Sequence, residues 1–196
     1  MSVAAQTLTE AGLEEVGRRE SALTAYALDR LRSVPGLKIY GDTDPRQDDD
    51  RVGVISFNIG SVHHALVAAV LGYEGGIGVR SGCFCAQPYV SHLLALSETE
   101  QMEWQRALRS GDQSRKPGMV RISFGAYNTF EDVDALVEML VRIARQEYQG
   151  KYHPVAATGE YLPAGHRDSL EEYFSLTSVA SQRRLSMSRA WAQVGV

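Results

Sequence analysis

The chain has 196 residues, of which 44% are hydrophobic and 22% charged, a composition typical of a globular protein with a sizeable core. Its formal net charge of −4 provides no broad basic surface, which argues against nucleic-acid binding. Two cysteines close in sequence form no disulfide framework, and neither a signal-peptide pattern nor an apolar run of membrane-spanning length is present, so we expect a cytoplasmic protein.

The first part of the chain predicts one helix and two strands. Apolar residues at helical spacing predict a single amphipathic helix over about 10–33, and a Pro-Gly pair at 35–36 ends it in a turn. Residues 37–40 form a short strand candidate. The aspartate-rich stretch over 41–51 is typical of a solvated loop, and the largely apolar run over 52–57 is suited to a buried strand.

A second helix is predicted after Ser61, which can cap it, with Gly72 near its end. His63 and His64 fall in its first turn. We expect both histidines to be exposed surface residues rather than ligands, because nothing nearby in the sequence completes a site. Residues 77–79 then form another short strand candidate.

The segment Arg80-Ser-Gly-Cys-Phe-Cys-Ala-Gln-Pro88 places Cys85 in a glycine-containing loop just before a predicted helix. Pro88 suits the first turn of that helix, which can continue over 89–96. A thiol before a helix N-terminus, with Arg80 nearby, lies in a positive field that favours the thiolate. The segment therefore predicts a reactive cysteine.

Three other interpretations of the two cysteines remain open from local sequence. A free cysteine is often a small buried hydrophobic residue. Cys83 and Cys85, with His92, could be metal ligands, although C-x-C with one loose histidine lacks the paired spacing of zinc sites. A Cys83–Cys85 disulfide would close a small and strained ring.

The second half of the chain turns polar over 98–118, with one predicted helix near 102–108 and a loop-like tail. Over 119–124, apolar and polar residues alternate as in a half-buried strand, which points Arg121 away from the apolar side. Thr129 caps the clearest helix in the chain. The predicted buried stripe of this helix consists of Val133, Leu136, Val137, Leu140, Val141 and Ala144.

Residues 148–196 differ in character from the rest. Glycines and prolines punctuate the stretch to about 166, and short helices are predicted near 168–174 and 179–194. The apolar face of the last helix is modest despite its arginines. We expect this extension to pack against a larger protein body rather than to contact nucleic acid or membrane.

The order of the elements predicts an α/β fold, an α+β two-layer sandwich in which helices cover a small mixed sheet. The loop around Cys85, together with Gly118-Met-Val-Arg-Ile-Ser-Phe-Gly-Ala-Tyr-Asn-Thr129, resembles the C-terminal small domain of the class V aminotransferase family of PLP enzymes. The branch it resembles is the group II cysteine desulfurases, and its Cys-Phe-Cys loop is also similar to that of the molybdenum-cofactor sulfurases. The resemblance implies a small domain of fold-type I over 10–147, with 98–118 as an insertion and 148–196 as an extension.

The resemblance also implies roles for individual residues. Cys85 matches the nucleophile that takes sulfur from a PLP-bound cysteine, leaving an enzyme persulfide and alanine. Arg121 matches the arginine that pairs with the carboxylate of the amino-acid substrate, a task suited to a planar donor. Arg80 matches the arginine that opens the loop and is expected to act on the electrostatics around the thiol.

Three further loop residues complete the predicted site. Gly82 supplies backbone freedom to a loop that must swing toward the cofactor, although its role could be only to shape a turn. Cys83 and Phe84 stand where the desulfurases commonly have histidines, which leaves the fine specificity open. Without the resemblance, Arg121 would read as an ordinary surface arginine.

The chain does not contain everything that PLP chemistry requires. Its three lysines, Lys38, Lys116 and Lys151, lack the Ser-x-His-Lys setting of the family's Schiff-base lysine, and no glycine-rich phosphate loop is present. We therefore expect no covalent PLP on this chain alone and no metal. The leading hypothesis is a small domain, separated by truncation or proteolysis, whose partner is a large PLP-binding domain or chain, with self-association through the surface left bare. The alternatives are a stand-alone persulfide relay and a non-catalytic interaction module.

Overall fold

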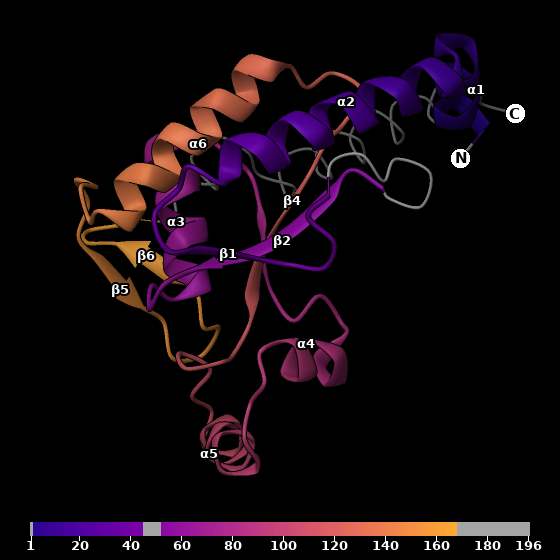
Figure 1. Cartoon of the computed structure of the whole chain (residues 1–196). Helices are drawn as coiled ribbons and strands as arrows, with labels where there is room; N and C mark the ends of the chain where they lie inside the picture. Colours follow the sequence, from indigo (N-terminus) through magenta and orange to yellow (C-terminus); the bar gives the residue numbers. More distant parts are fainter. Residues whose placement is uncertain (1, 45–51, 168–196) are drawn as a thin grey trace, which may run out of the picture. The chain divides into compact units, whose positions relative to one another are not determined.

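The computed structural model describes residues 2–44 and 52–167 (Figure 1). Residues up to Ala164 form one compact unit. The helices are α1 (Ser2–Ala11), α2 (Leu13–Leu31), α3 (His64–Gly75), α4 (Gln87–Leu93), α5 (Glu98–Arg109) and α6 (Phe130–Ala144). The strands are β1 (Leu37–Tyr40), β2 (Val54–Ile59), β3 (Arg80–Gly82), β4 (Met119–Ser123), β5 (Tyr152–Pro154) and β6 (Tyr161–Pro163). The helices expected near 168–174 and 179–194 lie outside the described residues.

The expected α/β class is confirmed, but the sheet is antiparallel where a mixed one was expected. Its strand order is β1-β2-β4-β3, and each described pair is antiparallel. The unit β2-α3-β3 is a crossover between two strands that run in the same direction. Because β4 inserts between them, neither strand pairs with a parallel neighbour.

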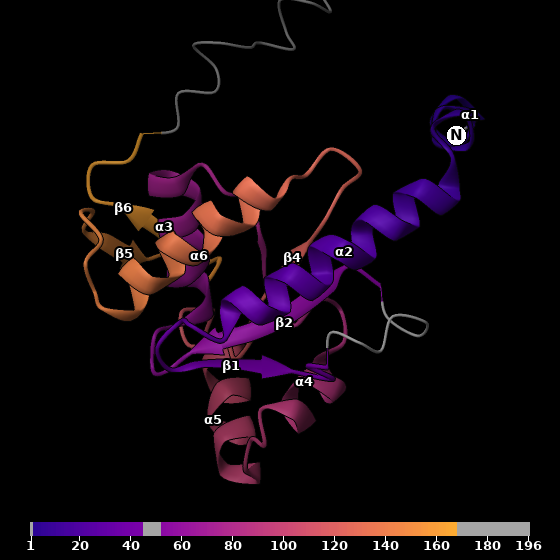
Figure 2. The same cartoon turned by 45° about the horizontal axis from the view of Figure 1, so that its top comes forward.

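One face of this sheet forms the core. In β2, Ile55, Phe57 and Ile59 are buried, whereas the residues between them are only half-buried. The strand is therefore half-buried and alternating, not buried on both faces as the apolar run over 52–57 suggested. Helices α2, α3 and α6 pack on the apolar face, on the same side of the sheet in both views (Figures 1 and 2).

The single helix expected over 10–33 is two helices. Gly12, with φ of 86°, separates α1 from α2, because a left-handed backbone cannot continue an α-helix. Within α2 the buried positions follow helical spacing, so the predicted amphipathic character is confirmed there. These positions are Leu23, Thr24, Ala27, Leu28 and Leu31.

Two short predictions around α3 were wrong. The helix begins after His63, whose Nδ1 accepts a hydrogen bond from the Ala65 N–H at 3.3 Å, so His63 rather than Ser61 is the cap. The strand expected at 77–79 begins instead at Arg80. The Ile77 N–H still bonds to the Leu71 carbonyl at 2.9 Å, so that residue closes the helix end instead of starting a strand.

Helix α6 matches its prediction closely. Thr129 caps it through a reciprocal pair of bonds with Asp132. Four of the six expected stripe residues are buried, whereas Val141 and Ala144 are half-buried against the core. The additional buried residues are Met139 and Ile143.

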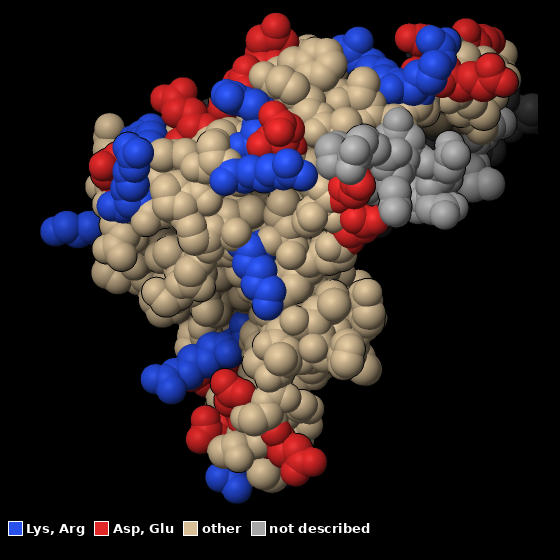
Figure 3. Space-filling view, viewed as in Figure 1, with Lys and Arg blue, Asp and Glu red and all other residues tan. Residues whose placement is uncertain are grey.

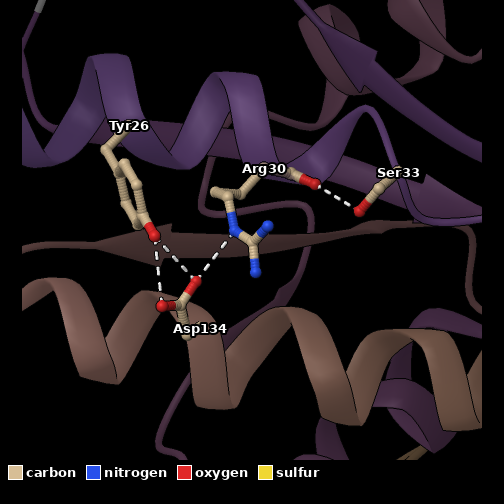
Figure 4. A network of polar contacts seen from close by, with 4 residues as sticks. All are labelled: Tyr26, Arg30, Ser33 and Asp134. Carbon is tan, nitrogen blue, oxygen red and sulfur yellow. Dashed lines mark hydrogen bonds and ion pairs between the residues drawn. The ribbon is translucent and has the colours of Figure 1, made fainter.

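A polar network joins α2 to α6 (Figure 4). Asp134 accepts hydrogen bonds from the Tyr26 hydroxyl at 2.9 Å and from Arg30 Nε at 2.8 Å. The bond to Asp134 is also the main cause that raises the pKa of Tyr26. This network fixes the register of the two longest core helices at their solvent-facing seam.

Replacing Asp134 with alanine should lower stability by less than about 1 kcal/mol, because the ion pair is partly exposed and screened. Urea denaturation would measure the change. Glu138→Ala is the matched control, since Glu138 is an exposed carboxylate one turn along the same helix. Equal midpoints for the two variants would contradict a stabilising role for the network.

The polar stretch after α4 contains a longer helix than expected. α5 covers 98–109, where the sequence predicted 102–108, because Ser97 and Glu100 form a capping box that starts the helix earlier. Trp104 is its one buried residue, and residues 110–118 form a loop, as predicted. α4 ends at Leu93, short of the expected 96.

The segment after α6 packs back onto α3. The Glu74 carboxylate accepts hydrogen bonds from the Gln149 and Gly150 N–H groups and from the Tyr152 hydroxyl, at 2.8 to 3.0 Å. Burial, together with this bond to Glu74, raises the pKa of Tyr152 to about 12. These contacts attach the β5–β6 hairpin to the core. The turn that connects β5 to β6 accepts hydrogen bonds from Gln113 of the 110–118 loop.

Charged side chains of both signs are interspersed on the face of the molecule shown in Figure 3. Over residues 2–44 and 52–167, no helix combines the length and the hydropathy needed to cross a membrane.

Candidate functional site

The segment with the two cysteines folds into a tight turn between β3 and α4. The Ala86 N–H donates to the Cys83 carbonyl at 2.8 Å, and the two central residues, Phe84 and Cys85, have φ of 54° and 61°. Positive φ at both central positions is the mark of a type I′ turn. It costs about 1 kcal/mol for each non-glycine residue, so other contacts must hold it. Cys85 is exposed at the tip, whereas Cys83 is half-buried.

Strand pairing places the two candidate arginines side by side. Arg80 of β3 is the direct cross-strand partner of Arg121 of β4. Arg121 also pairs with Ser56 of β2, a position on the face of the sheet opposite to the core, as the alternation in 119–124 predicted. Neither arginine has an ion-pair partner among the residues that the structure describes. Two like charges placed directly opposite destabilise a sheet, so this pair favours an anion.

Arg121 reaches the turn that carries Cys85. Its guanidinium carbon lies 5.0 Å from the centre of the Phe84 ring, within the range of a cation–π contact. Its Nε is buried and has no hydrogen-bond partner among the described residues. The structure thus brings together Arg80, Arg121 and Phe84, with Cys85 as the next residue along the turn.

Other polar residues, to which no sequence motif pointed, share this face. Strand register puts Lys38 opposite Asn58 and Tyr40 opposite Ser56. Asn58 donates from Nδ2 to the Gly118 carbonyl at 3.1 Å, while its buried Oδ1 has no partner within the described part of the chain. The alternation of residues 55–59 could have revealed Ser56 and Asn58, because apolar and polar residues occupy alternate positions there.

The root of the cysteine turn rests on a close backbone contact. A Cβ at Gly118 would lie 2.6 Å from the Gly82 Cα and 2.7 Å from His64 Nε2, so the two segments approach this closely only because residue 118 is glycine. Gly82 itself has φ of 111°, a conformation that residues with a side chain rarely adopt. Gly82 therefore shapes the start of the turn, whereas Gly118 allows the close packing.

The expectation that both histidines are exposed was wrong. His64 is 8% exposed, and its Nε2 lies 2.8 Å from the Lys116 carbonyl, which can only accept, so Nε2 carries the proton. Burial lowers the pKa of His64 to about 4. The Lys116 segment lies over His64, and a contact so distant in sequence gives no local signal. His63 is half-buried, and burial also lowers its pKa.

The lysines of this chain do not fit a covalent PLP site. Lys38 is exposed, and its Nζ lies 4.9 Å from the centre of the Tyr40 ring. Lys116 is half-buried, with its carbonyl 2.8 Å from His64 Nε2, and Lys151 is exposed just before β5. None of the three follows a histidine or lies beside a glycine-rich phosphate-binding loop, as the lysine of a PLP site does.

Two other features bear on ligands. A hollow of about 770 Å³ between α4 and α5 is lined by Gln87, Pro88, Ser91 and His92, among others, but by neither Cys85 nor Arg121. Among the described residues, no group of three His, Cys, Asp or Glu side chains is arranged to hold a metal ion.

Comparisons with known proteins find similar sequences and structures. A family model described as aminotransferase class-V matches residues 1–136. The cysteine desulfurases of Salmonella agona and Salmonella typhimurium are each 37% identical to this chain over 145 residues, which is 74% of this chain and 29% of theirs. The chain therefore spans less than a third of the length of these curated relatives.

Two solved structures are similar as well. The cysteine desulfurase CsdA of Escherichia coli, described as its S-sulfonic acid form, superposes with a TM-score of 0.54 at 27% identity, over 76% of this chain and 30% of that one. The apo cysteine desulfurase of Thermococcus onnurineus NA1 gives a TM-score of 0.52 at 28% identity, over 72% of this chain and 29% of that one.

Proposed function

The chain belongs to the aminotransferase class-V family, and from this premise we propose that it is the C-terminal small domain of a PLP-dependent cysteine desulfurase. In this proposal Cys85 accepts the sulfur, and Arg121 binds the carboxylate of the amino-acid substrate. The observation that supports it best is the 5.0 Å contact between the Arg121 guanidinium and Phe84, the residue next to the thiol.

The arrangement of the two arginines suits a carboxylate. A guanidinium offers its N–H donors along the edges of its plane, where they match the two oxygens of a carboxylate. The pairing of Arg80 with Arg121 concentrates positive charge on one side of the sheet, and the buried Nε of Arg121 has a free donor. A bound carboxylate would offset the positive charge and would accept a hydrogen bond from the free donor.

The step assigned to this chain is sulfur transfer to Cys85. The thiolate attacks the sulfur of the substrate cysteine and forms an S–S bond. The carbon–sulfur bond of the substrate breaks, and its electron pair stays on the carbon, which takes a proton to give alanine. Cys85 is left as a persulfide. An exposed thiol on a two-residue turn, with Gly82 at its root, can reach such a substrate and then present the persulfide to an acceptor.

The partner in this proposal is a large domain or chain that binds PLP. The lysines of this chain do not fit that cofactor, and the chain matches only 29% of the length of its desulfurase relatives. No step is therefore assigned to PLP on the residues described here.

The test fuses this chain to the part of the Salmonella agona cysteine desulfurase that lies before the segment similar to this chain. Sulfide release from L-cysteine is then measured with a reductant. The fusion should release sulfide, and this chain alone should not. Cys85→Ser should lower the rate by about 10³-fold or more, because it removes the nucleophile. Arg121→Met should raise KM by about ten- to a hundredfold, because it removes charged hydrogen bonds to the carboxylate.

Cys83→Ser is the matched control for the thiol, since it changes the neighbouring cysteine, and it should retain most of the activity. Equal losses in the Cys83 and Cys85 variants would contradict a dedicated nucleophile at 85. Visible absorbance from PLP bound to a lysine of this chain alone would contradict the assignment of the cofactor to another domain.

A further inference from the structure

Phe84 is the one side chain that joins the cysteine turn to the arginine strand in the contacts described above. The Arg121 guanidinium lies over its ring, with 5.0 Å between the ring centre and the guanidinium carbon. Residue 84 is also a central residue of the turn, where its φ is 54°. The contact therefore fixes a strained turn at one point to a side chain of β4.

The contact with Phe84 leaves a donor of Arg121 free for a carboxylate. A cation–π contact is made over the face of the aromatic ring, whereas a carboxylate accepts hydrogen bonds from the N–H donors of the guanidinium. The ring can therefore hold the guanidinium in place while a carboxylate binds to its free donors. The buried Nε, which has no hydrogen-bond partner among the described residues, is such a donor.

A carboxylate bound to Arg121 would weaken the contact between Arg121 and the Phe84 ring, and so would affect the turn. Pairing of Arg121 with an anion weakens the positive field that attracts the ring, because the two charges offset one another. The turn has two other fixed points, the bond from Ala86 to Cys83 and the glycine contact at its root, so loss of the stack loosens the residues between them. Cys85 is one of these residues.

We propose that Phe84 is a positioning residue that orients Arg121 and couples carboxylate binding at Arg121 to the mobility of the turn bearing Cys85. The proposal rests on the function assigned above and adds to it a link between substrate recognition and the thiol. Before a carboxylate binds, the stack holds the thiol in place. Once the carboxylate is bound, the turn is free to carry the thiol to the substrate sulfur.

The test uses the 196-residue chain in a Cys83→Ser background, so that Cys85 is the only thiol. The rate of alkylation of Cys85 by iodoacetamide is measured in Phe84→Leu, in Arg121→Met and in the double variant. Phe84→Leu should raise the rate about two- to fivefold, the range expected for loss of an exposed cation–π contact. The double variant should be no faster than Arg121→Met alone, because either change removes the same stack.

Two matched controls separate the stack from simpler effects. Arg80→Met removes a neighbouring positive charge but no stack, so its effect should add to that of Phe84→Leu. Tyr89→Leu removes an exposed aromatic ring from α4 and should leave the rate unchanged. In NMR spectra, the Arg121 Nε–H resonance should move downfield in Phe84→Leu, because the shielding of the ring is lost, and it should not move in Tyr89→Leu.

An unchanged or lowered rate in Phe84→Leu, or additive effects of Phe84→Leu and Arg121→Met, would overturn the coupling. An unmoved Arg121 resonance would do the same. These readouts need no sulfur chemistry, so they can fail while the fusion enzyme still depends on Cys85. Conversely, the alkylation and NMR results could support the coupling while the fusion enzyme keeps its activity without Cys85. That outcome would contradict the desulfurase assignment and not the coupling.

Discussion

Replacement of Gly118 with alanine is expected to destabilise the protein by up to about 3 kcal/mol, the upper range for overpacking in a tight interior. A Cβ at this position would lie 2.6 Å from the Gly82 Cα and 2.8 Å from the Gly82 carbonyl carbon. Both are backbone atoms, which cannot rotate away, so β3 and β4 must separate at the root of the cysteine turn. Urea denaturation measures the loss.

Gly72→Ala is the matched control for this experiment. Gly72 is an exposed residue of α3, and the methyl group of an alanine there would meet no neighbouring segment within 4 Å. The substitution should therefore raise stability by about 0.5–1 kcal/mol through helix propensity. If the two Gly→Ala substitutions change the free energy of unfolding in opposite directions, the loss at residue 118 comes from the contact with Gly82. Two variants of equal stability would show that the strands can part at little cost.

The parts of the fold that the sequence predicted well are those fixed by local patterns. β1 begins and ends where it was expected, and α6 shows its capping residue and most of its apolar stripe directly in the sequence. β3 was placed three residues too early. It is a three-residue strand that exists through pairing with β4, whose residues lie almost forty positions later, and local apolar character pointed to the wrong segment.

For the candidate site, the sequence predicted which residues to consider but not how they meet. Cys85 came from the loop motif. Arg121 came from the resemblance to the family, and strand alternation indicated only the side of the sheet that it faces. The contact of Arg121 with Phe84 depends on a left-handed turn built from non-glycine residues, and amino-acid preferences argue against such a turn. The burial of His64 likewise depends on Lys116, which folds over it from a distant loop.

Mild acid is expected to destabilise this protein through His64. Its pKa is lowered from 6.5 to about 4, chiefly by burial, while the bond to the Lys116 carbonyl opposes the shift and the nearby charges of His63 and Lys116 add to it. The unfolded chain therefore binds a proton at a higher pH than the folded one. Stability is complete above about pH 6.5 and falls as the pH drops toward 4, by about 2 kcal/mol at pH 5 and about 3 kcal/mol at pH 4.

The measurement is the free energy of unfolding in urea between about pH 7 and 5. Carboxylates with lowered pKa, such as Asp132 and Glu100, lose their contribution only at lower pH, so they do not obscure this window. His64→Gln keeps an N–H donor for the Lys116 carbonyl but cannot titrate, so it should remove most of the loss. His153→Gln, at an exposed histidine of β5, should retain it. If His64→Gln were as acid-sensitive as the native chain, another group would take up the proton on unfolding. The neutral, buried His64 would then not be the residue that holds the loop before β4 at neutral pH.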